Sequence, residues 1–142
     1  MPRTRTALRT AAIGATGTMA AAFLGTATPA SAVTPVGATG CNVTAWPPTG
    51  GSTVFGNGSV TCTTWYSGSI TITNQLRKYA NGKWSSVGEP VSKQFWGGTG
   101  VGDGASIPCG IFGTQSQFKT LTTAKVDGAT ASDASGAAGY SC

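Results

Sequence analysis

The chain has 142 residues, of which 22 are Gly and 4 are Cys, and it contains no His and only 4 acidic residues. Without His, no Ser–His–Asp triad, His-activated Cys nucleophile or His-ligated metal site can form. Four acidic residues also argue against catalysis by a pair of carboxylates. The net charge is +5, yet charged residues are 9% of the chain, against roughly 25% in an average soluble domain. We therefore expect one domain that is not an enzyme and has no cofactor or metal.

The first 32 residues have the three-part order of a signal peptide. Residues 1–9 are basic, an Ala-rich apolar run covers residues 11–24, and Ala30-Ser31-Ala32 supplies an A-x-A cleavage site. A helix of the mature domain is the alternative, but it does not explain this order. We expect cleavage after Ala32, secretion to the extracellular space and no membrane anchor, because the apolar run is too short and too interrupted to span a bilayer.

Residues 33–142 contain six basic and four acidic residues, a net charge of +2. Such a weakly charged surface is a poor match for a phosphate backbone, so we expect no nucleic-acid partner.

The four cysteines form an even set, which in an exported chain predicts two disulfides. Zinc is the alternative, but no pair has C-x-x-C spacing and no His completes a mixed site. Four cysteines permit three pairings. We favour Cys41–Cys62 and Cys109–Cys142, because each bridge would then join neighbouring strands.

Residues 33–40 are small, contain Pro and Gly and lack a pattern, so we expect a flexible N-terminal arm before a domain of residues 41–142. From residue 41 on, short runs of Thr, Val, Ile and aromatic residues alternate with Gly, Asn and Pro, and no 3.6-residue period is sustained. The expected strands are residues 41–45, 59–65, 69–79, 94–96, 106–112 and 117–126, with a glycine-rich connection at 97–104 and a weak last strand in the tail. This spacing predicts an all-β fold, a small immunoglobulin-like antiparallel β-sandwich; a small β-barrel is the alternative.

Asn81-Gly82 is the strongest local feature, because this dipeptide favours a type I′ hairpin turn. The turn fixes a register in which Tyr79 faces Trp84. One face then carries the apolar residues Ile70, Ile72, Leu76 and Val87. The opposite face carries Arg77, Tyr79 and Trp84, which have the composition of an interface hot spot; simple stabilisation of the sheet is the alternative. A β-bulge near Asn74 would reverse the faces on which these two sets of side chains lie relative to Ile70 and Ile72.

Four Trp residues supply large side chains in a chain of small ones. We expect one or two of them in the core, and Trp65, close to Cys62, to pack on a disulfide as in immunoglobulin domains.

The layout resembles a group of small exported proteins. It combines a cysteine just after an arm, a V-x-C strand ending at Cys62, an L-x-K-Y-x-N-G-x-W hairpin at residues 76–84 and a terminal cysteine. These features are similar to the small secreted immunoglobulin-like, disulfide-bonded proteins of high-GC Gram-positive bacteria, over most of residues 41–142. One such group is the adaptor subunit of umbrella toxin particles. There the domain docks on the ring of a large toxin subunit, and its N-terminal arm inserts into a lectin-like subunit.

The resemblance implies a non-catalytic adaptor within an extracellular antibacterial toxin complex, bound to a large toxin subunit and a lectin-like subunit. We therefore expect a secreted protein-binding module that contacts other secreted proteins through its arm and its hairpin. The expected contact residues are Val33, Thr34, Pro35, Val36, Arg77, Tyr79 and Trp84. A carbohydrate-binding module, with aromatic rings stacked on sugars, is one alternative. A small antimicrobial or hydrolase-inhibiting protein is the other, although a net charge of +2 does not favour the antimicrobial form.

Overall fold

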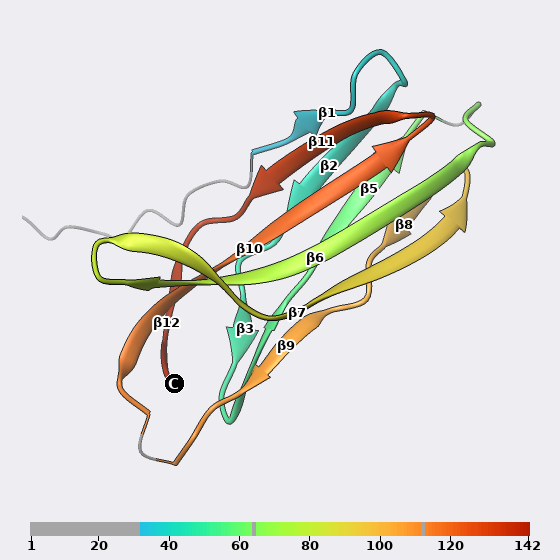
Figure 1. The fold of residues 1–142 in the computed structure, drawn as a ribbon. Helices are drawn as coiled ribbons and strands as arrows, with labels where there is room; N and C mark the ends of the chain where they lie inside the picture. The colour runs from blue at the N-terminus through green and yellow to red at the C-terminus, as the bar shows by residue number, and fades with distance from the viewer. Residues whose placement is uncertain (1–31, 64, 112) are drawn as a thin grey trace, which may run out of the picture.

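The computed structural model describes residues 32–63, 65–111 and 113–142 (Figure 1). The expected signal peptide lies outside the described residues except for Ala32. Every regular element of the described residues is a β-strand, and none of them forms a helix long and apolar enough to cross a membrane.

The strands form two layers, and all of their pairings are antiparallel (Figure 1). The first layer is a five-stranded sheet of β11 (Ala129–Ala134), β10 (Gln115–Val126), β6 (Ser69–Ala80) and β7 (Lys83–Trp96), with β12 (Ala138–Ser141) also paired to β10. The second layer holds two smaller sheets. One consists of β1 (Thr34–Pro35), β2 (Cys41–Ala45), β5 (Gly58–Cys62) and β8 (Thr99–Val101). The other consists of β3 (Thr49–Gly50), β4 (Thr53–Gly56) and β9 (Ala105–Pro108). The expected antiparallel β-sandwich is confirmed.

Side chains from both layers meet in two apolar clusters. In the first, Cys41, Val43 and Val60 of the second layer pack with residues of the five-stranded sheet, namely Ile70, Ile72, Ala124 and Val126. In the second, Val54 and Ala105 pack with Leu76 and Phe118. Buried and outward residues alternate along residues 69–77 of β6 and 118–126 of β10, which places one face of each strand in these clusters and leaves the other face outside.

The β6–β7 hairpin has the register that its turn predicts. Asn81 and Gly82 both have positive φ, at 52° and 77°, and Tyr79 pairs with Trp84. A bulge does occur, with Gln75 opposite residues 88–90. Because it adds two residues to β7, an even number, the side chains on either side of the bulge keep the same inward and outward alternation. The Gln75 side chain stabilises it by donating from Nε2 to the carbonyls of Val87, at 2.9 Å, and Gly88, at 3.2 Å.

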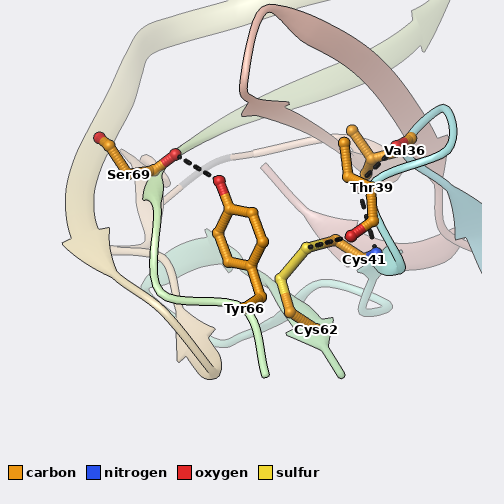
Figure 2. Close-up of a disulfide and its surroundings, with 6 residues drawn as sticks. All are labelled: Val36, Thr39, Cys41, Cys62, Tyr66 and Ser69. Carbon is orange, nitrogen blue, oxygen red and sulfur yellow. Dashed lines mark hydrogen bonds between the residues drawn. A yellow bond between two sulfur atoms is a disulfide. The ribbon is translucent and has the colours of Figure 1, made fainter. Parts of the chain in front are cut away.

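Both expected disulfides are confirmed, and no described cysteine is free. Cys41 and Cys62 are direct partners across β2 and β5, so this bridge lies within one sheet (Figure 2), whereas the immunoglobulin bridge joins two sheets. The Cys109–Cys142 bridge links the segment after β9 to the residue after β12 and lies beside the second apolar cluster.

The expected flexible arm at residues 33–40 is wrong. Thr34 and Pro35 pair with β2, and Val36 is fully buried in the first apolar cluster. The chain turns back at once, because the Val36 amide donates to the Cys41 carbonyl at 2.8 Å and the Thr39 hydroxyl donates to the Val36 carbonyl at 2.6 Å (Figure 2). A two-residue strand is too short to produce a hydrophobic period, so the pattern gave no sign of it.

The expectation of Trp in the core is also wrong. Trp65 is 91% exposed, and none of the four Trp residues is buried. Strand β5 ends at Cys62, short of the expected residue 65, and the chain then turns so that Tyr66 packs against the cluster that holds the Cys41–Cys62 disulfide (Figure 2). Tyrosine suits this position because its hydroxyl reaches the Ser69 carbonyl at 3.3 Å.

Tyr66 also has a shifted acidity. Desolvation raises the pKa of its phenol above the ordinary value of 10.0, and the nearby carboxylate of Asp127 raises it further, because it disfavours the charged phenolate.

The glycine-rich connection expected at residues 97–104 contains a short strand, β8, which pairs with β5. Gly100 lies directly over the Phe95 ring, and a Cβ at this position would overlap the ring. Glycine therefore lets β8 cross close to the edge of the five-stranded sheet.

Candidate functional site

The sequence-predicted hairpin residues share the outer face of the five-stranded sheet. Arg77 and Tyr79 lie on β6 and Trp84 lies on β7, opposite the side that carries Leu76. The pairing of β10 with β6 adds Lys119, which is the direct partner of Arg77. We call these four residues, Arg77, Tyr79, Trp84 and Lys119, the hairpin face.

Trp84 is the centre of the hairpin face. Its ring lies 5.3 Å from that of Tyr79, centroid to centroid, with an interplanar angle of 54°. The Lys119 ammonium lies 4.6 Å from the centroid of the Trp84 ring, in cation–π geometry. Arg77 donates from Nη2 to the Trp84 carbonyl at 3.0 Å. These contacts hold the indole in place before any partner arrives, which lowers the entropy cost of a later contact.

The hairpin face combines accessible aromatic surface with positive charge. Tyr79 is 45% exposed, and Arg77, Trp84 and Lys119 are each half-buried. Among the described residues, the only ion pair joins Lys93 to Asp103, at 3.1 Å and away from this face. The charges of Arg77 and Lys119 are therefore not neutralised by a carboxylate within the described fold.

The structure does not bring the N-terminal contact residues to the hairpin face. Thr34 and Pro35 lie beside β2, and the Thr34 hydroxyl donates to the Asp133 carboxylate of β11 at 3.4 Å. Val36 is in the core and is not available for contact, whereas Val33 and Pro35 are exposed.

Sequence reasoning missed Lys119. Alternation along β10 places it outward between the buried residues Phe118 and Thr120, and this could have been inferred from the sequence. Its place over Trp84 depends on the pairing of β10 with β6, which are far apart in the chain, so no local pattern reveals it. Among the described residues, no group of three His, Cys, Asp or Glu side chains is placed to hold a metal ion.

No protein-family model and no curated protein matches the chain. Among solved structures, the chain is similar to the solution structure of CsgH from R. palustris, with 12% sequence identity and a TM-score of 0.43. The similarity covers 68% of this chain and 89% of CsgH. We take neither a family nor a function from a similarity of this size.

Proposed function

We propose that this protein is a secreted, non-catalytic protein-binding module that uses the hairpin face to bind an acidic surface of another secreted protein. The observation that carries the proposal is the position of Trp84, in contact with both Tyr79 and Lys119 on the outside of a sheet whose other side is core. An aromatic anchor with an Arg beside it is the side-chain combination that dominates binding energy at protein interfaces.

The unneutralised charges of Arg77 and Lys119 indicate the chemistry of the partner. Carboxylates on a partner would meet both cations next to the aromatic rings, and such complementarity speeds association and fixes orientation. A rigid sheet also suits this role, because side chains that are already packed in place lose little conformational entropy when a partner binds.

The partner in this proposal is a subunit of an extracellular antibacterial toxin complex, with the present chain as adaptor. The large toxin subunit is the candidate for the hairpin face. A second contact with a lectin-like subunit would have to use the exposed Val33 and Pro35, since Val36 is part of the core.

Replacement of the central indole tests the proposal. We expect Trp84→Ala to weaken capture of the partner from culture supernatant by about 2 kcal/mol, roughly a thirtyfold rise in Kd, because the anchor and its packed surroundings are lost together. Tagged wild-type and variant proteins would be compared by pull-down, and the Kd for the captured protein would then be measured by titration.

Two matched variants act as controls. Trp65→Ala removes an indole that is 91% exposed elsewhere, and it should leave capture unchanged. Lys119→Glu should weaken capture, whereas Lys125→Glu, further along the outer face of β10, should have little effect. Equal capture by Trp84→Ala, Lys119→Glu and the wild type would rule out the hairpin face as the binding surface.

A further inference from the structure

A second feature lies on the other side of the molecule, on the outer face of the second layer. A groove of about 420 Å³ is lined by Trp46, Pro47, Thr49, Phe55, Asn57 and Gly104. We call it the aromatic groove. We propose that it is a binding site for a neutral glycan, independent of the hairpin face.

Two exposed aromatic rings line the groove. Phe55 is 49% exposed because it lies on β4 between Val54 and Gly56, which are both buried, so alternation turns its ring outward. Trp46 is 40% exposed and follows β2, where its amide donates to the Asn57 carbonyl at 2.9 Å. Flat, accessible rings of this kind present the surface on which the C–H face of a pyranose ring stacks.

The backbone that carries Trp46 is held firmly. Pro48 is buried, and its carbonyl accepts a hydrogen bond of 2.6 Å from the hydroxyl of Tyr140, which lies on β12 of the other layer. The adjacent Pro47 restricts the backbone further. The groove is therefore pre-formed, as small-molecule sites usually are.

Hydroxyl groups flank the Phe55 ring on both sides. Phe55 pairs with Thr49 of β3 and with Ser106 of β9, so the three side chains share the outer face. Thr49 and Ser106 are both exposed, and each hydroxyl can donate and accept hydrogen bonds. A ring bordered by hydroxyls matches a ligand that is apolar on one face and rich in hydroxyls at its edge.

The amide of Asn57 adds a fixed donor. Its Oδ1 accepts from the Gly58 amide at 2.7 Å and from Nδ2 of the buried Asn74 at 3.0 Å, which occupies both acceptor positions. Asn74 is held in turn by the Thr122 hydroxyl at 2.8 Å. The Asn57 Nδ2 has no partner among the described residues, so it remains free to donate to a ligand hydroxyl.

The absence of charged residues from the lining of the groove favours an uncharged ligand. None of its lining residues is charged. The carboxylate next in the chain to Gly104, that of Asp103, is neutralised by Lys93 at 3.1 Å. A phosphate or an acidic peptide would find no cation here, whereas the cations of Arg77 and Lys119 lie on the opposite face. Neutral hydroxyl-rich ligands therefore fit the groove better than charged ones.

Affinity electrophoresis in native gels tests the inference. The gels would contain hydroxyethyl cellulose, laminarin, soluble starch or glycol chitin, and we expect at least one of these polysaccharides to slow the wild-type protein. Trp46→Ala and Phe55→Ala should each weaken this binding at least tenfold, because each removes one stacking surface. The double variant Thr49→Ala with Ser106→Ala should weaken it severalfold. All four side chains are largely outside the core, so the folding of these variants can be verified by unchanged thermal unfolding.

Trp96→Ala, at an exposed Trp outside the groove, and Trp84→Ala, on the hairpin face, should migrate like the wild type. The inference is overturned if no polysaccharide slows the wild type, or if Trp46→Ala and Phe55→Ala are slowed as strongly as the wild type. Displacement of the polysaccharide by decaproline at equal or lower concentration would also overturn it, in favour of a proline-rich peptide site. Because the groove and the hairpin face share no residue, failure here leaves the proposed protein-binding function untouched.

Discussion

Removal of residues 33–40 is expected to lower the free energy of unfolding by about 3 kcal/mol relative to a chain that begins at Val33. Most of this loss comes from Val36, which is fully buried among side chains of both layers. The rest comes from the pairing of β1 with β2 and from the hydrogen bond between the Val36 amide and the Cys41 carbonyl. Urea unfolding followed by tryptophan fluorescence would measure the difference, with both disulfides intact.

Single substitutions separate the contribution of Val36 from that of the rest of the segment. Val36→Ala should cost about 2 kcal/mol, since it removes two buried methyl groups and leaves a cavity. Val33→Ala, at an exposed position of the same segment, should cost less than about 0.5 kcal/mol. An unchanged urea midpoint for the truncated chain would show that residues 33–40 add nothing to the fold.

Phe118→Ala is expected to cost about 4 kcal/mol of stability, the largest effect of any single substitution considered. Phe118 is the largest fully buried side chain and packs with Val54, Leu76 and Ala105 in the second apolar cluster. Its ring lies 6.4 Å from that of Tyr140, and the Lys78 ammonium lies 5.5 Å from its centroid. Truncation removes all of these contacts and leaves a cavity that strands on both layers cannot easily fill. Urea unfolding would again give the change.

A variant this unstable can fail to accumulate, so Phe118→Leu gives a second measurement, with an expected cost of about 1 kcal/mol. Ile111→Ala is the matched control, because Ile111 is an exposed apolar residue two positions after Cys109, whose disulfide lies beside the second cluster, and its loss should cost almost nothing. If Phe118→Ala lost no more stability than Ile111→Ala, the second cluster would not be a core.

Local features of the sequence predicted the β6–β7 hairpin of the five-stranded sheet and the pairing of β2 with β5 in the second layer. The Asn81-Gly82 turn determined the partner of every hairpin residue up to the bulge. This register also placed Tyr79 and Trp84 on the outer face of the sheet. The pairing of Cys41 with Cys62 was predicted because the bridge would join two neighbouring strands, which are β2 and β5. Both inferences were sound because turn geometry and strand alternation act over a few residues.

Features that depend on contacts between distant segments were not predictable in this way. The burial of Val36 requires a space between the layers that only the complete fold defines. Trp65 and Tyr66 are neighbours in an irregular turn, and it is Tyr66 that packs against the first apolar cluster, whose members come from both layers. The aromatic groove likewise joins the end of β2 to β4 and to Gly104, and neither Trp46 nor Phe55 carries a local pattern that marks it as a ligand contact.

Site-specific photocrosslinking gives the most direct test of the proposed binding surface. The photoreactive residue p-benzoylphenylalanine would replace Tyr79 of the hairpin face in one variant and Trp65 in another, and each would be irradiated in the supernatant of secreting cells. We expect position 79 to form one dominant crosslinked species containing a second secreted protein, and Lys119→Glu in the same chain to reduce its yield. Position 65 should give no such species. Crosslinking of that protein from position 65 and not from position 79 would contradict the account.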